Sequence, residues 1–355
     1  MKYRFIRKFN SYLNKAEIIL GRERLLSLPR YVQIEPTNRC NQLCVMCPRQ
    51  SQMDVPLGDM NFEQFKYILD RIFTIQNLQL NGLGEPFLNK DIIKMIKLAD
   101  QRGINVSINS NLGVVNKQMA EEIVKSGLKL LKVSFDSADP VVYQEIRGAS
   151  MPQMIQGLNH IVAARQARGL KKPIINFNSI IMTRNRANLV DILKFAEQAG
   201  VDAVRFKSLG LFASSTKDSL DVSSAQLLAD LKKARDEARS LSIENNLDEL
   251  IENIDTYRRP VGKYPCYIPW LEVYVQYYGG VRLCCNLFSR QYDLGNIFEE
   301  DFRKIWNSQN LITARREFKK GNLYFPACTS CNIFKANLEI DKKVKKVKKT
   351  LPFVR

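Results

Sequence analysis

Short apolar runs alternate with longer stretches in which apolar residues recur every three or four positions, and this rhythm fills residues 31–207. The short runs predict buried strands at 31–35, 77–81, 104–109, 130–135, 174–181 and 202–207. The longer stretches predict helices near 62–73, 90–102, 116–126, 151–168 and 187–199. Repeated strand–helix units indicate a parallel sheet with right-handed crossovers. Because there are fewer units than the eight of a closed barrel, we expect an α/β fold built on a partial (β/α)6 TIM-like barrel.

The ends of the chain and its last quarter follow other patterns. Residues 5–20 place apolar side chains at helical spacing among Lys and Arg, which predicts an amphipathic basic helix. We expect this helix to pack across the barrel bottom, with contact to a membrane surface or a polyanion as the alternative. Residues 223–242 predict a polar helix within a connector. Two apolar runs at 271–277 and 281–284, split by a Gly-Gly pair, predict a β-hairpin, and a helix is expected near 299–319.

These patterns divide the chain into five segments. We expect a basic helix at 1–30, the barrel at 31–207, a connector at 208–262, a small hairpin-plus-helix domain at 263–335 and a basic tail at 336–355. The Lys run at 342–349 is expected to be solvated or frayed.

Charge is concentrated at the two ends. The formal net charge is +18, and residues 1–30 carry eight Lys or Arg against two Glu. An acidic partner or a membrane surface would therefore meet the termini. No apolar stretch reaches the roughly 20 residues of a membrane span, and no signal peptide is evident. The sequence predicts a cytoplasmic protein.

Eight cysteines fall into two groups. Disulfides are disfavoured because cytoplasmic thiols stay reduced and a chain of this length needs no covalent staples. Clustered thiolates instead favour iron–sulfur clusters or zinc. The first group, Cys40, Cys44 and Cys47, has C-x3-C-x2-C spacing directly after the first predicted strand. Three thiolates fill three of the four irons of a cubane, and the fourth iron is left open for a chelating ligand. A zinc site or scattered core cysteines is the alternative.

This cysteine motif resembles that of the radical S-adenosylmethionine (SAM) superfamily, although Met46 stands where that family usually has an aromatic residue. Further motifs follow successive strands in the order typical of the family. The resemblance implies a [4Fe-4S] cluster on the three cysteines, and a SAM site that includes residues Gly82, Gly84, Glu85, Pro86, Asn109, Ser134, Asp136 and Arg147. Arg147 would pair with the methionine carboxylate.

The second group comprises Cys266, Cys284, Cys285, Cys328 and Cys331. Four thiolates around a hairpin suit one iron–sulfur cluster or one zinc ion, and the spacing alone does not distinguish these two kinds of site. The region resembles the shortened SPASM type called a twitch domain, which implies a second [4Fe-4S] cluster on Cys266, Cys284, Cys328 and Cys331. Cys285 is then left over. It is either a hydrogen-atom donor to a substrate radical or a small buried residue beside the cluster.

The resemblance implies reductive cleavage of SAM to a 5′-deoxyadenosyl radical, which abstracts hydrogen from a substrate C–H bond. Dehydrogenation or epimerisation of a small carbohydrate-like or aminocyclitol substrate is the leading expectation, with flavodoxin or ferredoxin as the electron donor. Peptide maturation is the runner-up. Only about 30 residues precede the first strand, too few for a fused leader-binding domain, and this weakens the peptide option. RNA modification is the third option, and no specific nucleic acid is expected. Six residues could line the substrate cavity, namely Asp54, Arg205, Lys207, Tyr264, Tyr267 and Glu272.

Overall fold

The computed structural model describes residues 2–51, 53–208, 225–254, 265–326, 328 and 334–350. The strands are β1 (Tyr31–Ile34), β2 (Asn77–Leu80), β3 (Asn105–Ser110), β4 (Leu130–Ser134), β5 (Ile174–Ile181), β6 (Ala203–Ser208), β7 (Glu244–Asn245), β8 (Glu272–Val275) and β9 (Val281–Arg282). The first helices are α1 (Lys2–Leu20), α2 (Phe62–Arg71), α3 (Ile92–Gln101), α4 (Lys117–Lys125), α5 (Pro140–Arg147), α6 (Met151–Ala167) and α7 (Leu189–Gln198). The later helices are α8 (Ala225–Glu237), α9 (Leu247–Glu252), α11 (Ile268–Leu271), α12 (Phe302–Trp306), α13 (Gln309–Lys320) and α14 (Phe334–Thr350).

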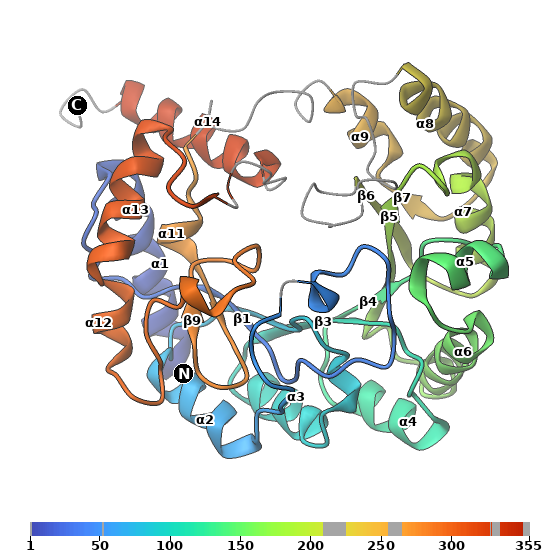
Figure 1. Ribbon diagram of the computed structural model, residues 1–355, viewed down its shortest axis with the longest axis horizontal. Helices are drawn as coiled ribbons and strands as arrows, with labels where there is room; N and C mark the ends of the chain where they lie inside the picture. Colours follow the sequence, from blue (N-terminus) through green and yellow to red (C-terminus); the bar gives the residue numbers. More distant parts are fainter. Residues whose placement is uncertain are drawn as a thin grey trace.

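All described strands belong to one curved sheet in the order β7-β6-β5-β4-β3-β2-β1-β8-β9. Neighbouring strands run parallel, except that β9 returns antiparallel to β8. Figure 1 shows the sheet as an arc with helices α2 to α8 along its outer side. Among the described strands, those at the two ends of this order do not pair with each other, so the barrel is open as the sequence predicts.

The C-terminal hairpin is not a separate sheet. Strand β8 pairs in parallel with β1, with Tyr31 opposite Glu272 and Ile34 opposite Val275. The hairpin itself is confirmed, because β8 and β9 are antiparallel across the Gly-Gly turn. Sequence pattern alone missed the pairing with β1, because strand pairing between distant segments leaves no local signal. The first strand of the C-terminal region therefore extends the barrel sheet.

The two faces of the sheet differ in polarity. Alternate strand residues such as Ile108, Val133 and Phe177 are fully buried and pack in one apolar core with helix residues such as Ile96 and Ile123. The other face carries polar side chains, because successive strand residues point to opposite sides. The helices cover the apolar outer face, so the polar face is the inner, concave one.

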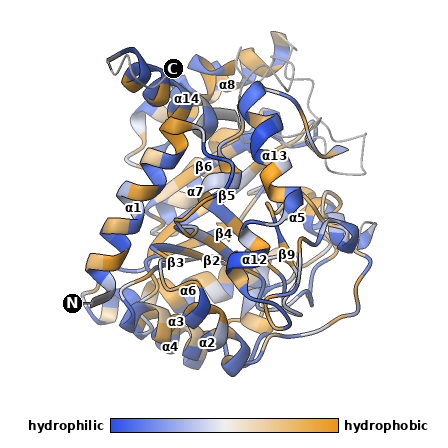
Figure 2. Cartoon of the chain, turned by 90° about the vertical axis from the view of Figure 1, so that its left-hand side faces the viewer, coloured by the Kyte–Doolittle hydropathy of each residue, from blue (hydrophilic) through white to orange (hydrophobic). Residues whose placement is uncertain are grey.

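Helix α1 docks on the barrel through polar side chains and through Ile18, which is buried in the apolar core. On the buried side, Asn10 exchanges two hydrogen bonds with the backbone of Leu28, and Asn14 donates to the carbonyl of Trp270 over 2.6 Å. Glu17 accepts from the backbone N–H of Leu26. The expected position across the barrel bottom holds, but an amphipathic helix usually docks by its apolar side. Here the aromatic side chains Phe5, Phe9 and Tyr12 are exposed. Figure 2 shows α1 along the edge of the molecule.

The secondary structure of the basic C-terminal segment also differs from the expected frayed tail. The Lys run lies within α14, which is helical through Thr350 rather than frayed. Val344 is buried and lines a hollow that α14 shares with α1. Within the described residues, no helix is both long and apolar enough to cross a bilayer.

Replacing Asn14 by Ala should lower the free energy of unfolding by about 1–3 kcal/mol, because the buried Trp270 carbonyl and Ser27 hydroxyl lose a hydrogen-bond partner. Lys15→Ala, at the exposed neighbouring position, should change it by less than about 0.5 kcal/mol. Urea unfolding of the cluster-free proteins measures both. Equal effects of the two substitutions would contradict a polar docking interface.

Candidate functional site

The predicted site residues gather at one end of the sheet. Cys40, Cys44 and Cys47 lie in the loop after β1, and the glycine-rich segment at 82–86 follows β2. Since the carboxyl ends of parallel strands meet at one edge, these loops converge there.

A buried carboxylate joins three of these segments. Glu35, directly after β1, accepts hydrogen bonds from the backbone N–H of Leu83 and from the hydroxyl of Tyr274 in β8, both over 2.8 Å. Gly82 packs so closely that an added Cβ would lie 2.1 Å from the Glu35 carboxylate. Burial raises the pKa of Glu35, and the hydrogen bonds from Leu83 and Tyr274 oppose that rise. The glycine is therefore required by the protein's own carboxylate.

Close packing also explains the glycine at position 84. An added Cβ would lie 2.3 Å from the carbonyl oxygen of Thr37, in the loop that leads to Cys40. The next residue, Glu85, donates its backbone N–H to the carbonyl of Arg39 over 2.7 Å. The absence of a side chain at Gly84 lets the β2 loop contact the cysteine loop. The place of Gly82 and Gly84 in the SAM site stays a prediction.

Glu85 carries the chain of contacts to β3. Its carboxylate accepts from the Ser110 hydroxyl and from the Asn111 backbone N–H, both over 2.7 Å. Burial raises its pKa to about 7, against the effect of these hydrogen bonds. The Asn111 side chain in turn lies 3.9 Å from the Cys40 sulfur. Pro86 begins a short 3-10 helix, Pro86–Leu88, and is buried.

Arg147 stands at the other side of the cysteine loop. Its guanidinium pairs with the Asp136 carboxylate over 2.5 Å and lies 3.8 Å from the Cys44 sulfur, and both Arg147 and Asp136 are buried. Burial disfavours the charge on Arg147, but Asp136 and Cys44 more than offset this and raise its pKa. Asp136 also accepts from the Ile180 backbone N–H over 2.7 Å. The two predicted SAM residues are thus in contact, and their assignment to particular SAM atoms stays a prediction.

The cysteine loop has its own small apolar core. Cys44 and Met46 pack with Ile146 of α5 and with Met182. Gly148, which ends α5 in the left-handed conformation at φ 60°, lies so close that an added Cβ would be 2.8 Å from the Leu43 carbonyl oxygen. Met46 takes the place of the aromatic residue expected from the resemblance and fills this core.

The three thiols lie together in one loop. Burial raises the pKa of Cys40 to about 11, while the sulfur of Cys44 exerts an electrostatic influence on both Cys40 and Cys47. Each thiolate of a cubane binds a different iron, and the fourth iron is left open. The donor set of three sulfurs and one open position therefore fits a [4Fe-4S] cluster.

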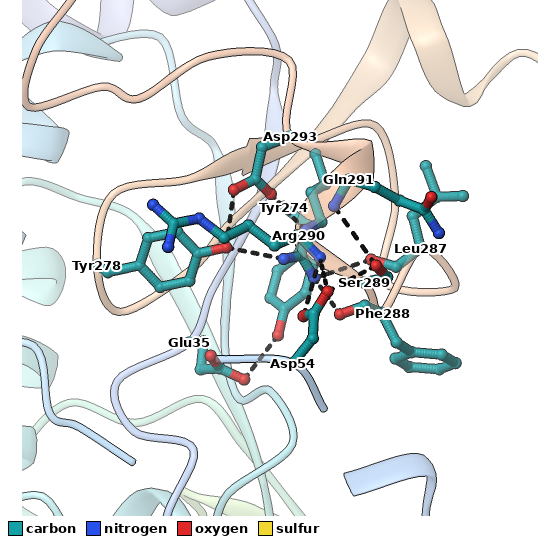
Figure 3. Close-up of polar contacts among 11 residues, drawn as sticks. Glu35, Asp54, Tyr274, Tyr278, Leu287, Phe288, Ser289, Arg290, Gln291 and Asp293 are labelled. Carbon is teal, nitrogen blue, oxygen red and sulfur yellow. Dashed lines mark hydrogen bonds and ion pairs between the residues drawn. The ribbon is translucent and has the colours of Figure 1, made fainter. Parts of the chain in front are cut away.

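A buried arginine organises the second cysteine region. Arg282 of β9 pairs with Asp293 over 2.6 Å and donates to the carbonyls of Leu287 and Phe288. The hydroxyl of Tyr278 donates to Asp293 over 2.8 Å, and Figure 3 shows these groups around the turn. These contacts fix the loop that carries Cys284 and Cys285.

The remaining predicted ligands are only partly visible. Cys266, Cys284 and Cys328 are half-buried against the core, and the Cys266 sulfur lies 3.8 Å from the Asn337 amide nitrogen of α14. Cys331 and Tyr264 lie outside the described residues. The set Cys266, Cys284, Cys328 and Cys331 therefore stays a prediction.

One carboxylate connects the two cysteine regions. Asp54, seven residues after Cys47, accepts from the Ser289 hydroxyl over 2.7 Å and from the Arg290 backbone N–H over 2.8 Å. Figure 3 shows Asp54 pointing toward both residues. These hydrogen bonds lower the pKa of Asp54, although its partial burial acts the other way. Asp54 thus connects the loops of the two cysteine groups rather than lining a cavity.

Ionisable groups occupy the inner face of the sheet. Lys132 of β4 donates to the Gln79 amide oxygen of β2 over 3.1 Å. Burial, and then repulsion from Lys207, lower its pKa to about 8, whereas Glu272 raises it. Burial raises the pKa of Glu272 to about 7, and Lys132 opposes this rise. Lys132 therefore lies within electrostatic reach of both Lys207, which is exposed to solvent, and the buried Glu272.

Amide side chains on the same face have spare acceptors. The side-chain oxygens of Asn109 and Asn176 are buried without a hydrogen-bond partner among the described residues. Both asparagines are in register with Lys132 on neighbouring strands, which places all three on one face. Buried acceptors of this kind call for a donor from a bound molecule or water. These two acceptors on the inner face of the sheet suit a polar ligand.

Cys285 belongs to the same interior. Burial lowers the pKa of Lys207, and the sulfur of Cys285 partly opposes this. The same sulfur helps to raise the pKa of Tyr274, after burial and the effect of Glu35. Cys285 therefore lies within electrostatic reach of Tyr274 in β8 and of Lys207 in β6.

The other candidates have local partners. Arg205 pairs with Glu244 of β7, and the Tyr267 hydroxyl contacts Asp341 of α14 over 3.1 Å. Sequence reasoning missed Lys132, Gln79 and Asn176. The signal was present, because polar residues alternate with apolar ones along these strands, and alternation marks a polar inner face.

Comparison with known protein families identifies two regions. Residues 34–196 match the radical SAM superfamily, and residues 266–332 match the SPASM iron–sulfur cluster-binding domain. A tungsten-containing aldehyde ferredoxin oxidoreductase cofactor-modifying protein from Pyrococcus furiosus is 25% identical over 322 residues, 86% of this chain and 87% of that protein. A GTP 3′,8-cyclase from Marinobacter nauticus is 28% identical over 179 residues, 48% of this chain and 52% of the cyclase. The chain thus spans about half of the length of that cyclase.

Solved structures confirm the fold. SuiB from Streptococcus suis, bound to SAM, superposes with a TM-score of 0.61 at 19% identity, covering 83% of this chain and 67% of SuiB. The structure of anSMEcpe with bound SAM gives a TM-score of 0.63 at 16% identity, covering 92% of this chain and 94% of that chain. At this level of identity the likeness concerns the fold alone.

Anaerobic reconstitution should give about eight irons and eight sulfides per chain, because two [4Fe-4S] clusters contribute four each. Replacing Cys40, Cys44 and Cys47 together by Ala should halve the iron and abolish 5′-deoxyadenosine formation. The matched control, Cys266→Ala with Cys284→Ala, should halve the iron but leave the ligands of the first cluster in place. Metal analysis measures the iron content of both variants, and chromatography measures 5′-deoxyadenosine. A preparation with about four irons and one zinc would contradict an auxiliary iron–sulfur cluster.

Proposed function

Because the chain is a radical SAM enzyme with a C-terminal SPASM-type iron–sulfur domain, we propose that it dehydrogenates or epimerises a small, carbohydrate-like substrate. When bound, the first cluster and SAM supply reductive cleavage and a 5′-deoxyadenosyl radical that abstracts hydrogen from a substrate C–H bond. An external one-electron donor such as flavodoxin or ferredoxin supplies the electron. The protein's own residues bind, orient and shield the reactants.

The polar inner face carries this proposal. Asn176 offers a buried oxygen that lacks a partner among the described residues, and this oxygen suits a hydroxyl group of a sugar or cyclitol. Lys132, opposite Asn176 on the neighbouring strand, adds positive charge, and Lys207 lies within its electrostatic reach, which suits a phosphate or carboxylate on the same molecule. A hydroxyl-rich, anionic small molecule satisfies both kinds of group. An apolar substrate would leave them unpaired, at a cost in free energy.

Two kinds of relative support a small-molecule substrate. The Marinobacter nauticus protein is named for GTP, which contains a ribose and phosphates. The Pyrococcus furiosus protein, which matches along most of both chains, is named for modifying a cofactor. Neither name points to a peptide. The similarity to SuiB concerns the fold and does not favour peptide maturation over this proposal.

The carboxyl edge of the sheet is the proposed SAM site. Cys40, Cys44 and Cys47 would hold the first cluster and leave one iron open to bind SAM. We propose that the remaining contacts come from the loops after the strands, through residues Gly82, Gly84, Glu85, Pro86, Asn109, Ser134, Asp136 and Arg147. The contacts from Glu85 to Asn111 and from Arg147 to Cys44 support this, because they connect these loops to the cysteine loop.

Cys285 separates the two outcomes. In an epimerisation its thiol gives a hydrogen atom to the opposite face of the substrate radical, and one electron and one proton then restore the resulting thiyl. In a dehydrogenation the substrate radical would lose a proton to a base, and the auxiliary cluster that Cys266, Cys284, Cys328 and Cys331 would hold would supply the electron acceptor. The electrostatic reach of Cys285 to Lys207 favours a position beside the substrate.

The substrate class is tested by 5′-deoxyadenosine formation with a panel of nucleotide sugars, sugar phosphates and aminocyclitols, and with a matched peptide panel. At least one polyhydroxylated anion should stimulate formation above background. Lys132→Met should weaken that stimulation about tenfold or more, because a charged hydrogen bond is lost. Lys129→Met, whose lysine pairs with Asp100 at the start of the same strand, should leave it unchanged. Stimulation by peptides alone would overturn the proposal.

Cys285→Ser removes a weak S–H bond and barely changes the side-chain volume. If the enzyme epimerises through this thiol, the variant should still form 5′-deoxyadenosine and fail to invert the carbon, and the wild type in heavy water should place one deuterium there. If it dehydrogenates, the variant should still give a product about two mass units lighter. Mass spectrometry distinguishes these results. Loss of about four irons in the variant would show that Cys285, not Cys284, is the cluster ligand.

A further inference from the structure

The outer side of α1 carries an exposed aromatic row. Phe5, Phe9 and Tyr12 are 75%, 62% and 60% exposed. Their spacing of four and three residues places them on one side of the helix. Ala16 and Leu20 continue the same side toward the C-terminal end of the helix and are also exposed. Exposed aromatic side chains in a contiguous row mark an interaction surface.

The orientation of α1 is fixed by its inner side. Arg7 donates to the Arg102 carbonyl over 2.7 Å, and Asn14 and Glu17 bond to the segments beneath the helix. Turning the aromatic row inward would break these buried hydrogen bonds. The folded chain therefore holds the row outward, whether or not a partner is present.

Positive charge borders the row on one flank. Arg4, Lys8 and Lys15 are exposed beside the aromatic residues, and all three line a hollow of about 750 Å³ at the barrel bottom. A second hollow of about 650 Å³ lies between α1 and α14, and its lining includes Lys15, Arg30 and Lys343. Figure 2 shows α14 near the C-terminal end of α1. Its exposed lysines, Lys342, Lys343, Lys345, Lys346, Lys348 and Lys349, extend the basic flank.

We propose that this surface, the outer side of α1 with the lysines of α14, binds the face of an anionic lipid bilayer. Phe5, Phe9 and Tyr12 would enter the headgroup–acyl boundary, where aromatic side chains are favoured. The bordering cations would contact lipid phosphates and strengthen the attraction to a negatively charged surface. This inference does not depend on the proposed reaction.

A second copy of the chain is a poorer occupant. A two-fold contact through this surface would bring two sets of Arg and Lys against each other, on a chain whose formal net charge is already +18. Nucleic acid would satisfy the cations. It would leave unexplained an aliphatic continuation at Ala16 and Leu20, which offers no ring for base stacking. An anionic bilayer meets both the apolar row and the charge.

Sedimentation of the reconstituted holoprotein with vesicles tests the proposal. The protein should bind vesicles of phosphatidylcholine with about one third phosphatidylglycerol, bind pure phosphatidylcholine much less, and lose binding as salt is raised. Phe5→Ser with Phe9→Ser should weaken binding about tenfold or more, because two apolar side chains no longer insert. Lys343→Glu with Lys346→Glu should weaken it similarly.

Matched controls carry the same changes on other surfaces. Leu170→Ser with Leu323→Ser, and Lys194→Glu with Lys232→Glu, replace exposed residues elsewhere and should bind as the wild type does. All variants should keep the wild-type rate of 5′-deoxyadenosine formation, which verifies folding. Binding that is insensitive to Phe5 and Phe9, or that is absent from anionic vesicles, would overturn the proposal. So would binding of single-stranded RNA, or a dimer in sedimentation velocity, that the Phe5 and Phe9 change abolishes.

Discussion

The buried carboxylate of Glu35 is the contact on which the arrangement of the site depends. It receives the backbone of the β2 loop through Leu83 and the hydroxyl of Tyr274 from β8, and it sits at the end of the strand that leads to the cysteine loop. A buried carboxylate is costly unless its oxygens accept hydrogen bonds. Breaking the bond to Leu83 or to Tyr274 would leave an oxygen without a partner, and this cost keeps both partners in place. One side chain thereby couples the first cysteine loop, the glycine-rich loop and the C-terminal region.

The same principle continues around the edge of the sheet. Glu85 holds the β3 loop, whose Asn111 contacts Cys40, and the Arg147–Asp136 pair holds the other side of the loop beside Cys44. The reactive edge is thus built from satisfied buried polar groups, while apolar packing is left to the outer face of the sheet. Such networks fix a single geometry because a partly broken network is worse than none. Radical chemistry needs this rigidity, since the substrate carbon must be held against one reacting group.

Sequence pattern predicted the local elements well and the distant contacts poorly. The six central strands and their helices follow from apolar periodicity, and the first cysteine motif follows from its spacing. The pairing of β8 with β1 had no local signal, and the helical Lys run was masked by its charge. The outward aromatic row of α1 was also missed, because apolar residues at helical spacing normally indicate the buried side. Its docking through Asn10, Asn14 and Glu17 depends on backbone partners that no periodicity shows.

The position of β8 beside β1 has a consequence for synthesis of the chain. Until Glu272–Val275 leaves the ribosome, one edge of Tyr31–Ile34 has no partner strand, and a bare apolar edge invites pairing with other chains. Glu35 likewise lacks the hydrogen bond from the Tyr274 hydroxyl until β8 has been synthesised. The edge that carries the cysteine loop is therefore completed only after the residues up to Val275 have been synthesised, and cluster insertion before that point would meet a barrel that still lacks one strand.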